Sequence, residues 1–370
     1  MKVLICIPCL MTGGTEIQTL NFIRALIKGG HRIVTVCYFE YCQEMVTRFQ
    51  QAGSEVICFS KEGARIRGWK GIVFLFKKFR KVLKQYRPEV VHVQYMAPGA
   101  IPILLLRLLG IRKIITTAHT FADIYPNLWL VHFVQRHCVR AFTCITKLAE
   151  CSFFGTYQLY TEQTRLKKRN HFTIYNTLPI GFSISRKAKN WDRPLTIGVV
   201  SRLESIKGMD LVVPAFTRVS ICHKEMRLLV VGDGTLRKQM EKQVHEAGLE
   251  DFVEFVGKQS QEMLPSYYDR IDILLMPSRS EGFGLTAIEG MARGCVVVAA
   301  HTGGLPEVVL DREVGLLHKS EQVDDLVTKI NTLIEQPMLW KRYSIEAITY
   351  VQQFSFERFS QLFNNLYKKL

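Results

Sequence analysis

Two glutamates eight residues apart mark the part of the sequence best suited to chemistry. They are Glu281 and Glu289, in the stretch MPSRSEGFGLTAIEGMARG of residues 276–294. We expect a strand to end just before this loop and a helix to begin near Gly284 or Leu285. Glu281 would then precede the helix, and Glu289 would lie just over one turn inside it. Two carboxylates at two depths of one pocket can accept hydrogen bonds from two sets of sugar hydroxyls.

The start of the same helix offers a second kind of contact. The first turn of a helix leaves its backbone N–H groups unpaired, and such groups bind anions and hydroxyls. The amides in question belong to Phe283, Gly284 and Leu285. A further glycine pair, Gly303-Gly304, follows the next strand-like run. We therefore expect this region to bind a ligand through backbone as well as side chains.

Two cations upstream are suited to a diphosphate. Arg202 comes just past a strand end, and Lys207 follows five residues later in a loop before a helix. An arginine can hold a phosphate by two parallel hydrogen bonds, whereas a lysine acts as a point charge. The alternative interpretation is a pair of solvated surface cations. Gly232, in the turn Val231–Thr235, excludes a side chain, so that backbone can pack closely or approach a ligand there.

The first strand-like run leads into a glycine pair, Gly13-Gly14. Its spacing differs from the Gly-x-Gly-x-x-Gly fingerprint, and no acidic residue caps a following strand, so a dinucleotide site is disfavoured. A glycine pair at a helix start still exposes N–H groups to an anion and allows close approach. A plain tight turn is the alternative. Glu16, in the first helical turn, is favourable against the helix dipole in either case.

The excess positive charge lies in the N-terminal half of the chain. Residues 1–180 hold 25 Lys and Arg against 9 Asp and Glu, whereas residues 181–370 hold 24 of each. Residues 61–87 alone carry ten basic residues and one acid. Apolar residues recur there at helical spacing, at Trp69, Ile72, Val73, Phe76, Phe79, Leu83 and Tyr86. The candidate basic surface consists of Lys70, Lys77, Lys78, Arg80, Lys81 and Lys84.

Two interpretations of this basic helix stay open. It is either an ordinary domain helix with a solvated side, or a surface that sits on anionic lipid, where each cation contributes on the order of 1 kcal/mol. Nucleic acid is disfavoured as a partner, because no recognised nucleic-acid motif accompanies the charge. The sequence after Lys2 lacks a signal-peptide pattern, and no apolar run is long enough to span a bilayer. We expect a cytoplasmic protein, peripheral on the inner face of the cytoplasmic membrane.

The ten cysteines favour buried thiols over a metal or redox site. Cys6 and Cys9 have metal-knuckle spacing, but no second pair or histidine cluster stands at a matching distance. An intracellular location would also argue against disulfides.

The elements that must position these residues follow a βαβ rhythm. Short, mostly β-branched runs in the first half predict strands at residues 3–7, 33–37, 56–59, 90–93 and 114–118. Helical patterns separate them, as over Glu16–Lys28, which ends at a glycine pair. After a polar linker over residues 181–194, strands are predicted at 196–200, 228–231, 253–255, 273–276 and 296–299. This alternation is typical of parallel, doubly wound sheets.

We therefore predict two Rossmann-like α/β domains that face each other across a ligand-binding cleft. The length of 370 residues suits two domains. The first would span residues 1–180 and the second residues 195–355. The last helical pattern, over residues 356–370, has no partner strand.

In their order along the chain, these motifs resemble those of the retaining family 4 glycosyltransferases, which have the GT-B fold. The resemblance covers almost the whole chain. It rests on the Gly13-Gly14-Thr15-Glu16 turn, His119 after the fifth strand, Ser201-Arg202-Leu203 with Lys207-Gly208, Gly232-Asp233-Gly234, Glu281 with Glu289, and Gly303-Gly304-x-Pro306-Glu307. The ending Phe354-Ser-Phe356-Glu-Arg is similar to the family's last helix, which crosses back to the N-terminal domain.

The resemblance implies that the C-terminal domain binds a nucleotide-sugar. Arg202 and Lys207 would hold the diphosphate and stabilise the departing nucleotide. Glu289 would bind the ribose hydroxyls. Glu281, with the amides of residues 283–285, would bind the hydroxyls of the sugar.

It also implies contacts outside that core. Gly14 would let backbone reach the phosphate from the other domain, and the loop around Gly257 and Lys258 would lie near the base. His119 would sit over the sugar as a hydrogen-bond partner rather than a nucleophile. A core histidine is the alternative, and His119 lacks the following Asp that some members have.

The implied enzyme moves a hexose, with retention, from a nucleotide-sugar to a glycan acceptor in bacterial surface polysaccharide synthesis. The donor would be a UDP-hexose, with GDP-mannose as the alternative, and the acceptor would be a glycan or a polyprenyl-diphosphate-linked acceptor at an anionic membrane surface. A UDP-sugar 2-epimerase and a non-catalytic sugar-nucleotide-binding partner are the alternatives of other classes. No Asp-x-Asp pair occurs, so we expect Arg202, Lys207 and helix N-termini, not a metal, to meet the leaving-group charge. No cofactor is expected.

Overall fold

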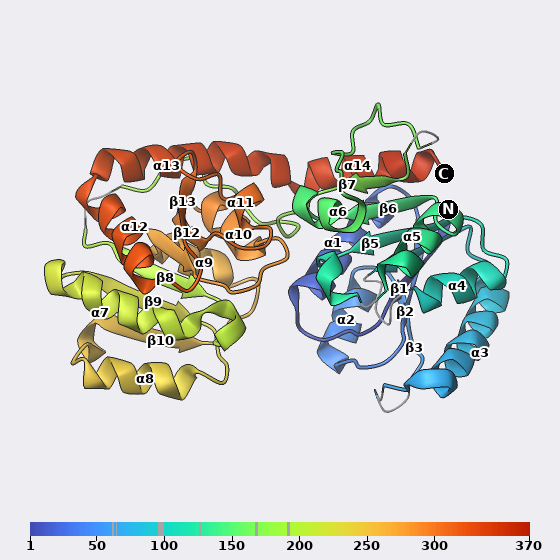
Figure 1. Cartoon of the computed structure of the whole chain (residues 1–370), viewed down its shortest axis with the longest axis horizontal. Coiled ribbons are helices and arrows are strands. Elements are labelled where there is room, and N and C mark those ends of the chain that lie inside the picture. The colour runs from blue at the N-terminus through green and yellow to red at the C-terminus, as the bar shows by residue number, and fades with distance from the viewer. Residues whose placement is uncertain (61–62, 64, 95–99, 126, 167–168, 191–192) are drawn as a thin grey trace. The chain divides into compact units, whose positions relative to one another are not determined.

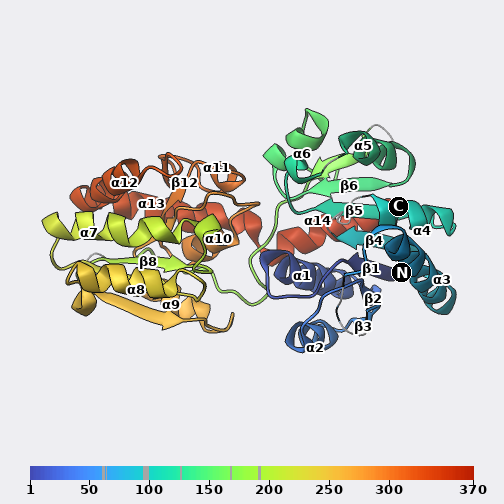
Figure 2. The same cartoon turned by 60° about the horizontal axis from the view of Figure 1, so that its bottom comes forward.

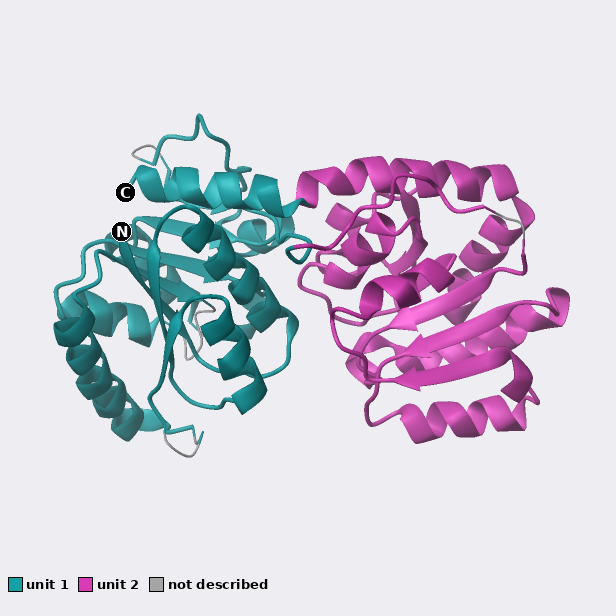
Figure 3. Ribbon diagram, turned by 180° about the vertical axis from the view of Figure 1, so that it is seen from behind, with its two compact units in different colours: residues 1–180, 355–370 teal, residues 181–354 magenta. Residues whose placement is uncertain are grey.

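The computed structural model describes residues 1–60, 63, 65–94, 100–125, 127–166, 169–190 and 193–370. The chain forms two compact units: unit 1 is residues 1–180 with 355–370, and unit 2 is residues 181–354 (Figure 3). Each unit is a parallel sheet with helices on both faces (Figures 1 and 2). The predicted fold class of two Rossmann-like α/β domains is confirmed. In the described part of the chain, no helix is both long and apolar enough to cross a membrane.

The sheet of unit 1 has seven parallel strands in the order β3-β2-β1-β4-β5-β6-β7. They are β1 (Lys2–Ile7), β2 (Arg32–Cys37), β3 (Glu55–Cys58), β4 (Val90–Gln94), β5 (Ile114–Ala118), β6 (Ala141–Cys144) and β7 (His171–Thr173). The chain winds from β1 out to β3 and then returns to the other side of β1 with β4. In doubly wound sheets, ligands bind at the carboxyl ends of strands beside such a switch point.

Helices cover both faces of this sheet because side chains of a strand alternate between the faces. The helices are α1 (Gly14–Lys28), α2 (Gln43–Gln51), α3 (Gly68–Tyr86), α4 (Ile101–Leu108), α5 (Leu128–His137), α6 (Lys147–Phe154) and α14 (Phe356–Lys368), with a 3-10 turn, η1 (Ala122–Ile124). Leu4 of β1 belongs to a core that contains Phe79 of α3. The next residue, Ile5, belongs to the opposite core, with Leu26 of α1 and Phe363 of α14.

The sheet of unit 2 has six parallel strands in the order β10-β9-β8-β11-β12-β13, and its switch point lies between β8 and β11. The strands are β8 (Thr196–Val200), β9 (Arg227–Val231), β10 (Val253–Gly257), β11 (Ile273–Met276), β12 (Val296–Ala300) and β13 (Gly315–His318). The helices are α7 (Val212–Cys222), α8 (Arg237–Glu246), α9 (Leu264–Arg270), α10 (Leu285–Ala292), α11 (Leu305–Val308), α12 (Val323–Glu335) and α13 (Pro337–Tyr350). Short 3-10 turns are η2 (Ser205–Lys207), η3 (Met209–Leu211), η4 (Glu250–Phe252) and η5 (Val351–Phe354).

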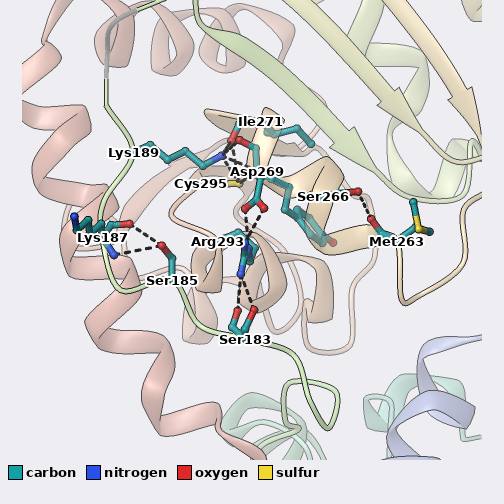
Figure 4. A network of polar contacts seen from close by, with 11 residues as sticks. Ser183, Ser185, Lys187, Lys189, Met263, Ser266, Asp269, Ile271, Arg293 and Cys295 are labelled. Atoms are coloured by element: carbon teal, nitrogen blue, oxygen red, sulfur yellow. Dashed lines mark hydrogen bonds and ion pairs between the residues drawn. The ribbon is translucent and has the colours of Figure 1, made fainter.

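The described part of the segment predicted as a linker, residues 181–190 and 193–194, is fastened to unit 2 (Figure 4). The Arg293 guanidinium donates to the backbone oxygen and the hydroxyl of Ser183, at 3.1 and 2.7 Å. The same guanidinium pairs with the Asp269 carboxylate at 2.7 Å. The start of the segment is therefore tied to α9 through one arginine.

Lys189 makes a second attachment, at the C-terminal end of α9. Its ammonium donates to the backbone oxygens of Tyr268 at 2.6 Å and Asp269 at 3.1 Å, and also to that of Ile271 (Figure 4). The last carbonyls of a helix lack intrahelical partners, so a lysine that binds them caps the helix. The segment thus stabilises α9, which carries Tyr268.

Candidate active site

The residues predicted to bind a diphosphate and a sugar gather at the switch point of unit 2. Arg202 and Lys207 follow β8, and Glu281 follows β11, which pairs with β8 in the sheet. Parallel strands present their carboxyl ends at the same edge, so these loops are neighbours.

Lys207 and Glu281 form an ion pair at this edge. The Lys207 ammonium lies 2.6 Å from one Glu281 carboxylate oxygen. A lysine ammonium has three donors and a carboxylate has several acceptor positions, so neither group is saturated by this contact. A phosphate could share the ammonium while a sugar hydroxyl donates to the carboxylate.

Glycines bring three loops of the site into direct backbone contact. Gly208 has φ +67°, and a Cβ there would lie 1.9 Å from the Pro277 carbonyl oxygen. Gly303 has φ +52°, and a Cβ there would lie 2.0 Å from the Glu281 carbonyl oxygen. The Gly304 N–H donates to the same oxygen at 3.0 Å. The loops after β8, β11 and β12 therefore fix one another's positions.

Arg279 fastens the loop that carries Lys207. Its guanidinium makes two hydrogen bonds to the Asp210 carboxylate, at 2.7 and 2.8 Å, and donates to the Ser205 backbone oxygen at 2.5 Å. It also pairs with Glu321 at 3.0 Å. Bidentate contacts of this kind fix geometry as well as adding energy. Arg279 is therefore a structural clamp between the loops that follow β8, β11 and β13.

Glu289 is buried inside α10 and has one identified partner. The Tyr268 hydroxyl donates to its carboxylate at 2.8 Å. Burial raises the pKa of Glu289 to about 7, against the lowering effect of that hydrogen bond. One carboxylate oxygen is thus oriented by Tyr268, and the protonation state of the group changes near neutral pH.

The amides predicted to bind the ligand lie at the start of α10. This helix begins at Leu285, as the sequence predicts, and Gly284 stands before it at φ +102°. Phe283 is buried and packs edge-on against Phe354. First-turn N–H groups of a helix have no intrahelical acceptor, so the amides of Gly284 and Leu285 are suited to an anion or a hydroxyl.

The other residues predicted to bind the donor also lie at the carboxyl edge of the sheet of unit 2. Gly232 follows β9 at φ +140°, and a Cβ there would lie 1.8 Å from the Ser201 carbonyl oxygen. Its N–H donates to the Gly257 oxygen at 2.9 Å. Lys258, the next residue, is exposed. Arg202 is exposed as well, and it forms no salt bridge with another residue of the described chain.

His119 lies in unit 1, just past β5, in a small pocket. It is buried, and its Nε2 atom lies 2.8 Å from Oε1 of Gln94. Burial lowers the pKa of His119 to about 4, so the ring is neutral near pH 7. His119 is buried like a core residue and also lines a pocket. Its position therefore fits both the interpretation as a core histidine and the interpretation as a hydrogen-bond partner of a ligand.

The glycine pair Gly13-Gly14 is covered by the Glu16 side chain from the first turn of α1. Gly14 is the first residue of α1, and a Cβ on Gly13 would lie 2.6 Å from a carboxylate oxygen of Glu16. Glu16 is buried and accepts a hydrogen bond from the Cys9 thiol at 3.5 Å. The Glu16 carboxylate folds back over the helix start, so an anion approaching Gly14 would meet a negative charge. A phosphate contact at Gly14 stays a prediction.

The basic helix of the sequence is α3, and most of its predicted apolar face packs on the core of unit 1: Phe79 is buried there, and Ile72, Phe76, Leu83 and Tyr86 pack against that core. The sequence pattern places Trp69 on the apolar face, whereas it is 75% exposed. Leu75, Phe79 and Val82 are the large apolar side chains that the helix buries. Five of the six predicted basic residues are exposed, and Lys78 is half-buried over the Phe74 ring.

Three residues of these surroundings are missing from the sequence-based prediction. Tyr268 orients Glu289, Gln94 contacts His119, and Arg279 clamps the Lys207 loop. Gln94 carried a signal, since a polar residue at the end of an apolar strand is unusual. Tyr268 and Arg279 carried none, because their partners come from other elements.

The sequence matches known families in both halves. Residues 182–349 match the family described as glycosyl transferases group 1, and residues 12–151 match glycosyltransferase family 4. An uncharacterized glycosyltransferase of Methanocaldococcus jannaschii is 28% identical over 307 residues, which cover 83% of this chain and 82% of that protein.

A second relative has a more specific name. The GDP-mannose-dependent alpha-(1-6)-phosphatidylinositol monomannoside mannosyltransferase of Mycobacterium tuberculosis is 24% identical over 267 residues, or 70% of this chain and 69% of that protein. Among solved structures, Anabaena Alr3699/HepE in complex with UDP matches all of both chains with a TM-score of 0.81 at 19% identity. At that identity, the structural match concerns the fold.

Proposed function

We propose that the chain, a glycosyltransferase with the GT-B fold, moves a hexose, with retention, from a UDP-hexose to a lipid-linked glycan. The observation that carries the proposal is the Lys207–Glu281 pair, which places a cation for a phosphate beside a carboxylate for a sugar at a switch point. Glu289, on helix α10, would accept hydrogen bonds from the ribose hydroxyls.

The transfer requires charge stabilisation at the leaving group. The bond between the sugar's anomeric carbon and the diphosphate breaks, and a bond to an acceptor hydroxyl forms on the same face of that carbon. The hydroxyl proton passes to an oxygen of the departing diphosphate. Negative charge then grows on the departing diphosphate. We assign its stabilisation to Lys207, to Arg202 and to the first-turn amides of α10. Turnover that persists with a chelator would support this metal-independent mechanism, and a loss restored by Mn²⁺ would contradict it.

Membrane attachment through unit 1 forms part of the proposal. Helix α3 presents Lys70, Lys77, Lys81 and Lys84 to solvent, together with the exposed Trp69. On α5, Trp129 is 71% exposed and stacks on Phe133 with ring centroids 5.7 Å apart. Basic side chains with exposed tryptophans are the composition of a surface that binds anionic lipid. Such a surface would deliver the enzyme to a polyprenyl-linked acceptor in bacterial surface polysaccharide synthesis.

The identity of the nucleotide is the finer part of the proposal. A UDP-sugar is the first choice because the Anabaena structure with the same fold holds UDP, and that protein was also solved with UDP-glucose. GDP-mannose is the second candidate, because the mycobacterial relative is named for it.

A donor panel tests these statements. The full chain would be incubated with UDP-glucose, UDP-galactose, UDP-N-acetylglucosamine and GDP-mannose, each with bacterial lipid extract. Release of UDP that depends on the extract, with label in the lipid fraction, is the expected result. Transfer from GDP-mannose alone would identify GDP-mannose, and not a UDP-hexose, as the donor. Turnover with none of the four nucleotide-sugars would contradict the proposed donor class.

A further inference from the structure

The pocket that His119 lines is also lined by the polar side chain of Gln94. Its lining includes Gln94, Thr117 and Asn176 with aromatic residues of α1 and α14, and among its lining residues His119 is the only titratable one. Gln94 ends β4, and β4 and β1 flank the switch point of unit 1. The pocket therefore lies at the edge of the sheet where ligands of doubly wound folds bind.

We infer that Gln94 is a positioning residue that sets which nitrogen of His119 carries the proton. The Gln94 carbonyl oxygen faces His119 Nε2 at 2.8 Å, and an amide oxygen can only accept. Nε2 must therefore carry the hydrogen and donate it. A neutral imidazole has a single N–H, so Nδ1 is left with its lone pair.

The neighbouring strands hold this arrangement in place. Gln94 pairs in register with Thr117 across β4 and β5. The Thr117 hydroxyl lies 2.7 Å from His92 Nε2 and 2.7 Å from the Thr143 hydroxyl. On its other side, His92 Nδ1 lies 2.9 Å from the Tyr367 hydroxyl of α14. A buried polar chain thus spans three strands and one helix, and its member Thr117 lines the pocket.

The amide nitrogen of Gln94 points to a ligand. Gln94 is 1% exposed, and its Nε2 atom has no hydrogen-bond partner among the described residues. Leaving a buried donor unpaired costs about 1 to 3 kcal/mol, so such a group indicates a missing partner. Gln94 Nε2 is therefore available to donate a hydrogen bond to a ligand hydroxyl in the pocket. This inference rests on the proposed role of His119 as a hydrogen-bond partner of the sugar.

The test is a tautomer measurement that needs no turnover. The full chain would be labelled with ¹⁵N-histidine, and the His119 signal identified by its loss in His119→Gln. The wild type should show the Nε2–H form. Gln94→Leu should shift His119 toward a mixture of tautomers, whereas Gln94→Glu, which keeps acceptor oxygens at the same size, should retain Nε2–H. An Nδ1–H form in the wild type, or no change in Gln94→Leu, would overturn the inference.

Kinetics then separate the two functions of the amide. Gln94→Glu lacks the free N–H donor but keeps the tautomer, so kcat/KM should fall by about tenfold, the value of one hydrogen bond. In Gln94→Leu, kcat/KM should fall further than in Gln94→Glu. The control is Gln18→Leu, because Gln18 lines the same pocket but donates to the Thr177 backbone oxygen, at 2.7 Å, and should leave the tautomer unchanged. Full turnover in His119→Gln would contradict the proposed function instead, without affecting the tautomer result.

Discussion

Glu289 is the residue whose chemistry depends most strongly on its surroundings. An exposed glutamate is ionised throughout the physiological range, but burial raises the pKa of Glu289 to about 7. Only the ionised form can accept two hydrogen bonds from vicinal ribose hydroxyls without offering a proton of its own. The affinity for a nucleotide-sugar should therefore follow the titration of this one group.

We predict that donor binding weakens as the pH falls through 7. With a pKa of about 7, the ionised fraction drops about tenfold between pH 8 and pH 6, and the dissociation constant for UDP-glucose should rise by about the same factor. Isothermal titration calorimetry over this range measures the effect. UDP-glucose is the right probe because its diphosphate does not titrate there.

Tyr268→Phe provides the matched variant. The Tyr268 hydrogen bond lowers the pKa of Glu289, so its loss should raise that pKa and move the midpoint of the binding curve to higher pH. A midpoint that does not move, or a flat profile in the wild type, would show that Glu289 does not govern donor binding.

The sequence reveals which side chains could bind a donor but not how they are held. Lys207 and Glu281 are recognisable because their loops follow strands, and the structure brings them to 2.6 Å. Tyr268 and Arg279 could not be predicted, since each acts on a residue that reaches it only through the tertiary fold. The fold of Glu16 back over Gly13 was likewise not foreseen.

At the scale of elements, the candidate site is a set of loops interlocked by glycines. Gly208→Ala should therefore disturb the site beyond the conformational cost of a positive φ, because the new Cβ would lie 1.9 Å from the Pro277 oxygen. We predict a loss of donor affinity together with a lowered melting temperature.

The control for this variant is Gly248→Ala, in the same unit. Gly248 has φ +65°, close to the +67° of Gly208, but a Cβ there meets nothing within 4 Å. It should show only the conformational cost of about 1 to 2 kcal/mol, measured as a shift in melting temperature with unchanged donor affinity. Equal effects of both substitutions on affinity would refute the interlocking of the loops.

Helix α3 carries the prediction about membranes. Replacing the exposed Lys77, Lys81 and Lys84 by Glu should abolish sedimentation with vesicles that contain phosphatidylglycerol. Each basic residue near an anionic surface contributes about 1 kcal/mol, so removing three should lower the partition coefficient by at least about a hundredfold. Binding of the wild type should also decrease with added salt.

A charge-matched control lies in unit 2. Lys224, Lys238 and Lys242 are exposed there, and their replacement by Glu changes the net charge of the chain equally. That variant should still sediment with the vesicles. If the two triple variants behave alike, α3 is a solvated face and not a membrane surface.

The sequence predicts most of the elements, and the three omitted strands have a common cause. β6 (AFTC) and β7 (HFT) are short and mix polar with apolar residues, and β13 (GLLH) begins with a glycine. Such runs show little strand periodicity, and they become strands because an existing sheet edge is available for pairing. Periodicity correctly predicted most of the packed face of α3 but included Trp69, which lies in the first turn of the helix and is exposed.

At the scale of the molecule, the two units differ in the chemistry that they offer. Unit 2 holds the loops suited to a diphosphate, a ribose and a sugar, whereas unit 1 holds the basic helix and the His119 pocket. The fold class was predictable because the βαβ rhythm occurs twice. The return of the last helix to unit 1 was predictable only from the resemblance, and in the structure it follows from Phe356, Phe359 and Phe363, which α14 buries in that unit's core.

Lys207 and Glu281 are expected to bind the donor, and a comparison of two lysines separates this role from that of an ordinary ion pair. Lys329 pairs with Asp325 in the same unit with side chains 21% and 24% exposed, much like the 20% and 18% of Lys207 and Glu281. Donor turnover would be measured for Lys207→Ala and Lys329→Ala. Lys207→Ala should lose about a hundredfold or more in kcat/KM, with Lys329→Ala unchanged. Equal turnover of the two variants would show that Lys207 does not bind the donor.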